Sequence, residues 1–97
     1  MKTIEITAKE WFDKINGNSY FSAEIVTNYG TDKEKIFKLP FQYGYGTQYL
    51  EESKNILTEF NLISPIHGQS LKKYCNENNI VLNTRKIENC KKSELKN

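Results

Sequence analysis

The sequence predicts an α+β fold: a small single domain with an antiparallel or mixed sheet of about four strands and two to three helices on one face. Three observations lead to this prediction. The chain has 97 residues, which is enough for one hydrophobic core only. Several segments alternate apolar and polar residues, as half-buried strands do. Two such segments follow each other directly and predict a hairpin at 19–41, so strands and helices do not alternate strictly.

The first segments predict a short strand followed by a helix. Residues 2–6 alternate, as a strand does. Thr7 is a typical N-cap residue, and Glu10 three residues later completes the pattern of a capping box. Asn16-Gly17 is typical of a helix end, because glycine adopts the left-handed conformation there at no cost. We therefore expect a helix that begins at Thr7 and ends at Asn16.

The hairpin is predicted by two alternating segments around a turn. Residues 19–29 alternate, and a second strand returns from Lys35 to Phe41 with Phe37, Leu39 and Phe41 facing inward. Pro40 has no backbone N–H group to donate, so this strand ends there or lies at an edge of the sheet. An edge strand also leaves pairing with a second copy of the chain open.

The second half of the chain predicts two more helices and a last strand. Thr47 is an N-cap candidate for the second helix, and a third helix is expected from about Gln69 to Asn78. Residues 80–87 indicate the last strand. We expect residues 1–90 to form one domain and residues 91–97 to be a frayed, polar, basic tail. The predicted core consists of Ile4, Ile6, Trp11, Phe21, Ile25, Phe37, Leu39, Ile56, Leu57, Phe60, Leu71 and Leu82.

The composition argues against secretion and against a membrane span. No apolar run approaches the length of a transmembrane helix, and no apolar signal segment follows the first residues. Cys75 and Cys90 are the two cysteines, and we expect free thiols in a reducing compartment. These features favour a cytoplasmic protein that does not contact membranes.

The chemistry-bearing residues predict no enzyme, metal site or cofactor. His67 is the single histidine, so a serine–histidine–aspartate triad has one candidate base at most, and zinc would lack its usual close pairs of ligands. Cys75 lies eight residues from His67, but inside a predicted helix, where a small apolar role explains it. We therefore expect a protein that acts by binding.

Positive charge is concentrated in the last third of the chain. Residues 68–97 have a net charge of +4, whereas residues 1–67 have a net charge of −2. This end could bind nucleic acid or an acidic partner, or it could be a solvated face with no partner. The candidate residues for nucleic acid or an acidic partner are Lys72, Lys73, Arg85, Lys86, Lys91 and Lys92.

A tyrosine- and glycine-rich segment precedes the second helix. Two glycines before a helix N-terminus could let a phosphate approach the backbone, and the tyrosines could stack on a nucleotide or bind a protein. Alternatively, the glycines only turn the chain and the tyrosines only pack. The candidate residues for protein or ligand binding are Tyr20, Tyr43, Gly44, Tyr45, Gly46 and Tyr49.

Two runs of the sequence resemble a group of phage proteins. One run extends from Trp11 to Phe21 and contains Asn-Gly-Asn-Ser-Tyr-Phe; the other extends from Leu39 to Gly46 and contains Phe-Gln-Tyr-Gly-Tyr-Gly. Together they resemble small accessory proteins of tailed bacteriophages and prophages. The resemblance covers about residues 8–60, and it carries no catalytic or binding residue over to this chain. It implies a small protein in the cytoplasm of a bacterial host that binds host machinery or a defence complex, sometimes as an inhibitor.

Three functions therefore follow from the sequence. The favoured one is a non-enzymatic protein-binding module that inhibits a host or defence protein through the tyrosine loop and the hairpin. The second is nucleic-acid binding by the basic C-terminal third. The third is capture of a nucleotide or another small ligand at residues 43–49.

Overall fold

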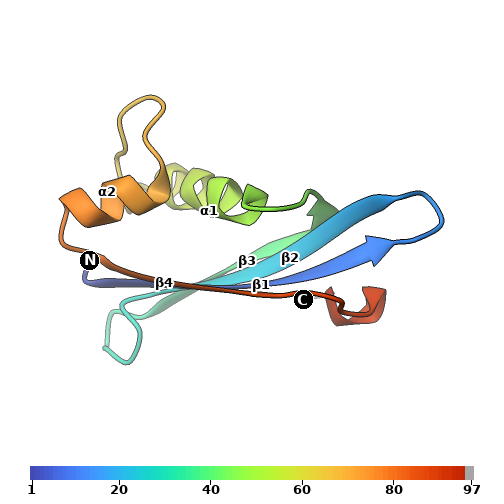
Figure 1. Cartoon of the computed structure of the whole chain (residues 1–97). Helices are drawn as coiled ribbons and strands as arrows, with labels where there is room; N and C mark the ends of the chain where they lie inside the picture. The colour runs from blue at the N-terminus through green and yellow to red at the C-terminus, as the bar shows by residue number, and fades with distance from the viewer. Residues whose placement is uncertain (96–97) are drawn as a thin grey trace.

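The computed structural model describes residues 1–95 and confirms the α+β class. A mixed sheet of four strands carries two α-helices on one face, and a single 3₁₀ turn, η1, lies on the other face (Figure 1). Along the chain the elements are β1 (Thr3–Asp13), β2 (Asn18–Thr27), β3 (Lys35–Tyr43), α1 (Gln48–Glu59), α2 (Leu71–Glu77), β4 (Val81–Ile87) and η1 (Lys92–Leu95).

The strands lie in the order β3-β2-β1-β4. The first three form an antiparallel meander, as short turns allow, and β4 then pairs in parallel with β1. The chain reaches β4 by crossing one face of the sheet through α1 and α2 (Figure 1). The two central strands, β1 and β2, are therefore bonded on both sides, and β3 and β4 form the two edges.

The prediction of a helix from Thr7 to Asn16 is wrong, because β1 continues through Thr7 as far as Asp13. The alternation of Ile4 and Ile6 extends to Ala8, and all three side chains are buried under the helices. Pairing with a strand on each side outweighs the local capping signal, since strand propensity depends on cross-strand neighbours more than on the single residue. Asn16-Gly17 forms the turn of a hairpin instead of a helix end.

The hairpin expected at 19–41 is confirmed, with one correction inside β3. Leu39 faces the helices, opposite Ala23, as predicted. Phe41 does not: a β-bulge opposite Ser22 puts one extra residue into β3 and turns the Phe41 ring to the helix-free face. Pro40 lies within this edge strand, where its missing N–H group is tolerated.

Both later helices form where the sequence predicts them, and their N-terminal caps differ from each other. Thr47 precedes α1, but within the described chain its side chain makes no capping hydrogen bond. Ser70 caps α2, since its hydroxyl oxygen accepts a hydrogen bond of 3.1 Å from the backbone N–H of Lys73. Ser64 and Pro65, which precede α2, lie in an irregular loop. No helix among residues 1–95 is long and apolar enough to cross a membrane.

The core lies between the helices and the sheet. Most of the predicted core residues are buried or packed against this core. Trp11 is instead on the helix-free face, and Phe60 is largely exposed beside Phe37.

The expected frayed tail is also corrected over residues 91–95. Leu95 of η1 is fully buried, and η1 contacts β1 and β2. The last two residues of the expected tail, Lys96 and Asn97, lie outside the described residues.

Candidate binding surfaces

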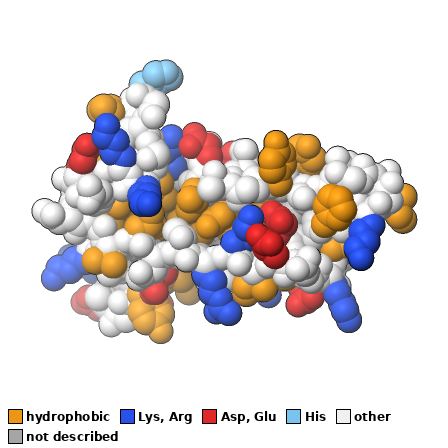
Figure 2. Space-filling model, viewed as in Figure 1, with side chains coloured by type: hydrophobic (Ala, Val, Ile, Leu, Met, Phe, Trp, Pro, Cys, Tyr) orange, Lys and Arg blue, Asp and Glu red, His pale blue; other side chains and the backbone are white. Residues whose placement is uncertain are grey.

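The end of the sheet that carries the β1–β2 turn exposes large apolar side chains. Strands β1 and β2 extend beyond the other strands here, because β4 stops opposite Lys9 and β3 stops opposite Tyr20. Figure 2 shows hydrophobic side chains gathered at this right-hand end of the molecule. We call this end the hairpin-end surface; its residues and their exposed fractions are Phe12 (48%), Ile15 (94%), Tyr43 (61%) and Tyr45 (69%). It includes both sides of the sheet, because Phe12 alternates to the helix side and Tyr43 lies beside Tyr20 on the helix-free side.

The turn that carries Ile15 is held by the carboxylate of Asp13. One oxygen accepts the backbone N–H groups of Ile15 (3.0 Å) and Asn16 (3.3 Å), and the other accepts the side-chain amide of Asn16 (2.8 Å). The Asn16 side-chain hydrogen bond is the main cause that lowers the pKa of this carboxyl below its usual 3.8. The N–H of Gly17 closes the turn on the Asp13 carbonyl oxygen at 2.7 Å. Ile15 is therefore presented to solvent by an ordered turn.

An aromatic cluster of Trp11, Tyr20, Phe41 and Tyr43 lies on the helix-free face. Tyr20 stacks on Phe41 with ring centroids 5.0 Å apart and on Trp11 at 5.6 Å, and Tyr43 meets Tyr20 edge-on. The ammonium of Lys92 lies 5.5 Å from the Trp11 ring and 5.9 Å from the Phe41 ring. With η1 packed beside it, most of the cluster is a second, small core.

The tyrosine–glycine segment does not form one site. Tyr49 belongs to α1 and is buried, Tyr20 belongs to the aromatic cluster, and Tyr43 and Tyr45 are exposed. Gly44 has a packing role: a Cβ there would lie 2.6 Å from the Phe21 ring, so a larger residue cannot fit without a shift. Strand pairing brings Tyr20 beside Tyr43, whereas Tyr49 packs into the core and is separated from them.

A hollow of about 540 Å³ does lie at the start of α1. It is lined by residues 43–48 and by Glu51. The carboxylate of Glu51 lines the space that a phosphate would enter, and Lys54 pairs with that carboxylate at 3.1 Å. The residues at this helix start therefore favour neither a phosphate nor a nucleotide.

The six basic candidates are spread over three places. Lys72 and Lys73 lie on α2, Arg85 lies on β4, and Lys91 and Lys92 lie near the hairpin end. Lys86 has a structural role instead: its ammonium lies 3.4 Å from the carboxylates of Glu10 and Glu88 and donates to the Gly46 carbonyl oxygen at 3.3 Å. One continuous basic face is therefore not formed.

Sequence reasoning missed Phe12 and Ile15 because they were assigned to a helix and its end. A signal for them was present, since Asn-Gly between two alternating segments is a strong hairpin pattern. Had residues 7–13 been interpreted as a strand, the exposed turn would have followed directly.

Groups with nucleophilic or metal-binding chemistry do not converge. Cys75 and Cys90 are free and buried, and burial raises the pKa of the Cys75 thiol, which disfavours the reactive thiolate. His67 is exposed in the loop between the helices. Over residues 1–95, no cluster of three or more histidine, cysteine, aspartate or glutamate side chains could hold a metal ion.

Comparisons with protein-family models, with curated proteins and with solved structures find no match for this chain. Its function therefore has to be inferred from the surfaces described above.

Proposed function

We propose that this protein is a binding module that acts by contacting another protein, without catalysis, through the hairpin-end surface. The observation that supports it most is Ile15, which is 94% exposed on a turn fixed by the Asp13 carboxylate. An apolar side chain held in an ordered turn gains binding energy when buried, and the turn has already lost its conformational freedom. Exposed Tyr43 and Tyr45 add the residue type that is most typical of interface hot spots.

The partner we propose is a protein of a bacterial host, such as a component of a defence complex, which binding would inhibit. The resemblance to phage accessory proteins, which covers the β1–β2 hairpin and the tyrosine segment, supports this choice.

Affinity purification from an expressing bacterial host tests the proposal, with and without nuclease. Ile15→Ser should remove a captured partner, because the exposed apolar anchor is lost. Ile66→Ser is the matched control, since Ile66 is also strongly exposed, at 72%, but lies in the loop between the helices. Equal recovery of the partner by both variants would reject the hairpin-end surface.

A second candidate, single-stranded nucleic acid, is supported by one observation. Lys92 is remote from Trp11 and Phe41 in sequence, yet its ammonium lies over both rings. Rings next to a cation are the elements of a single-strand binding platform. Trp11 is the single tryptophan, so its fluorescence should be quenched by oligo-dT, and the affinity should fall steeply with salt. Unchanged fluorescence at low salt would reject this candidate.

A further inference from the structure

The two edges of the sheet differ in how they are protected. Edge strand β3 contains Pro40, a bulge, and the exposed lysines Lys35 and Lys38. The side-chain amide of Gln42 also donates to the Pro40 carbonyl oxygen at 3.0 Å. The proline, the bulge and the lysines are devices by which proteins prevent an edge strand from pairing with another chain. Edge strand β4 has neither a proline nor a bulge in its pairing with β1.

Strand β4 presents regular hydrogen-bonding groups on its free side. The N–H of Val81 donates to the Lys2 carbonyl oxygen at 2.9 Å, so Val81 directs its backbone groups toward β1. In parallel pairing every second residue does the same, and the residues between them direct both groups away. Leu82, Thr84 and Lys86 therefore direct their N–H and C=O groups outward. An extended peptide of matching spacing could bond to all three.

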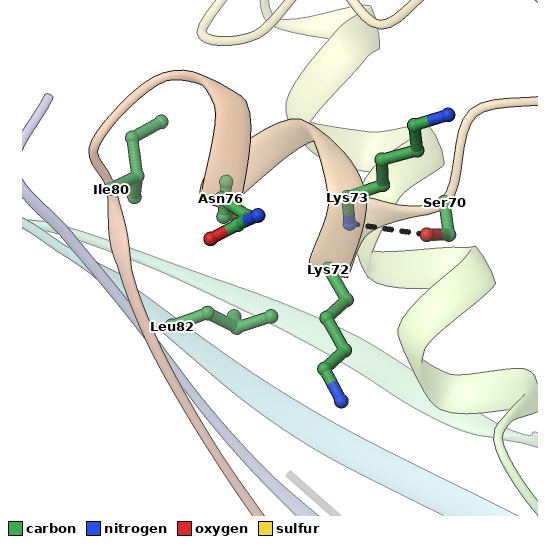
Figure 3. Close-up of a pocket in the computed structure, with 7 residues that line it drawn as sticks. Ser70, Lys72, Lys73, Asn76, Ile80 and Leu82 are labelled. Carbon is green, nitrogen blue, oxygen red and sulfur yellow. Dashed lines mark hydrogen bonds between the residues drawn. The ribbon is translucent and has the colours of Figure 1, made fainter.

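A hollow of about 570 Å³ lies beside this edge, between α2 and β4. Ile80, Leu82 and Cys75 supply its apolar lining, and Lys72 and Asn76 of α2 also line it. Figure 3 shows Lys72 extending from α2 past the tip of Leu82, whereas Lys73 points away from β4. Because Leu82 faces the helix side, a residue paired beside it would direct its side chain toward this hollow.

The charges around this edge favour an acidic peptide. Among residues 1–95, no ion pair within 4.0 Å engages Lys72, Lys73 or Arg85. Lys72 lies on the helix side of β4, and Arg85 alternates to the other side. An acidic strand would meet a cation on either side of the edge. A second copy of this chain would bring its own Arg85 and lysines to the same place and be repelled.

We propose that the β4 edge and the adjacent hollow bind an extended acidic peptide, which adds a fifth strand to the sheet and inserts an apolar side chain over Leu82. This is recognition by strand addition, in which main-chain hydrogen bonds give affinity and alternate side chains give specificity. It goes beyond the proposed function, because the site is separate from the hairpin-end surface and takes a partner segment of different chemistry.

Amide hydrogen exchange by NMR on the full chain tests the proposal. The probes are peptides of about nine residues in which valine alternates with glutamate, the same peptide with lysine in place of glutamate, and a glutamate version with two central prolines. The glutamate peptide should slow exchange at Leu82, Thr84 and Lys86 by roughly tenfold or more at saturation. The lysine and proline peptides should leave these amides unchanged, because one has the wrong charge and the other cannot pair.

Charge-reversal variants locate the peptide. Lys72→Glu with Arg85→Glu should weaken binding of the glutamate peptide by roughly tenfold or more, measured by fluorescence anisotropy. Lys35→Glu with Lys38→Glu is the matched control on the β3 edge and should change the affinity by less than about twofold. All four side chains are exposed, so the fold should survive each change.

Several results would overturn the proposal. These are no binding of the glutamate peptide at about 1 mM, equal binding of the lysine or proline peptide, or slowed exchange in β3 instead of β4. Protection of the same three amides by oligo-dT alone would assign the edge to nucleic acid. If protection of these amides rises with protein concentration in the absence of peptide, the β4 edge pairs with a second copy of the chain instead.

Discussion

The two faces of the sheet differ in what holds their cover in place. On one face, α1 and α2 bury a broad core that includes Ile6, Ile25 and Leu57. On the other, the cover is one 3₁₀ turn, anchored by Leu95, by Lys92 over two rings and by the hydrogen bond from the Cys90 N–H to the Glu10 carbonyl oxygen. The first face should set the stability of the whole chain. The 3₁₀ turn that covers the second face should detach locally while the sheet remains folded.

Leu57→Ala tests the helix-covered face and should have the largest effect. Leu57 is fully buried in the core, and its truncation leaves a cavity. We expect a loss of about 2–5 kcal/mol in the free energy of unfolding, measured by urea denaturation. A loss below about 1 kcal/mol would mean that α1 contributes little and that the two covers are alike.

Leu95→Ala tests the helix-free face and should cost less, although Leu95 is equally buried. We expect a loss of about 1–2 kcal/mol, because a terminal turn can detach without unfolding the sheet. Trp11 should become more accessible to acrylamide, since η1 lies beside its ring. Lys91→Ala, an exposed neighbour, is the control. A loss as large as that of Leu57→Ala would show that the tail is part of the global core.

Lys92→Ala isolates the cation–π contact of the same cover. Loss of the ammonium 5.5 Å from the Trp11 ring should cost about 0.5–1 kcal/mol and change the Trp11 emission. Lys92→Arg should retain most of the stability, because a guanidinium also stacks on aromatic rings. Identical emission spectra for all three proteins would place no cation over the ring in solution.

The smallest expected effect is at the hairpin tip and depends on pH. The folded-state pKa of Asp13 is lowered, chiefly by the Asn16 side chain. The carboxylate therefore holds the turn above its unfolded pKa, and this contribution is lost as the pH falls through the lower folded pKa. The amide resonances of Ile15 and Asn16 should shift below about pH 4 and stay constant above about pH 5.5. In Asp13→Asn this titration should disappear; its persistence would assign it to another group.

Local sequence patterns were enough to predict an element where one of its faces is buried. The alternation around Phe21 and Ile25 identified β2, and the helix expected from about Gln69 to Asn78 contains α2. They failed at Thr7 to Asp13, where a complete capping signal lies inside a strand that pairs with β2 along this whole stretch and with β4 as far as Lys9. They failed again at Phe41, because a bulge depends on the register of two strands and leaves no mark in either one.

The candidate surfaces were less predictable than the fold for the same reason. Lys86 was grouped with the basic residues, but its partners Glu10 and Gly46 are 76 and 40 positions away in the sequence. Lys92 was assigned to a frayed tail, although it lies over Trp11. Composition identified basic and aromatic residues as binding candidates, but only the long-range contacts of the fold show which of them already have partners within the chain.

The parallel pairing of β1 with β4 also has a consequence for the order of folding. Thr3 is opposite Val81, so the second partner of β1 arrives only after both helices have been synthesised. Until then the β1–β2–β3 meander has β1 as an unprotected edge, with Ile4, Ile6 and Ala8 without their final neighbours. Such non-local closure slows folding and exposes the nascent chain to wrong partners. The β4 segment thus completes the native sheet and, at the same time, shields its central strand.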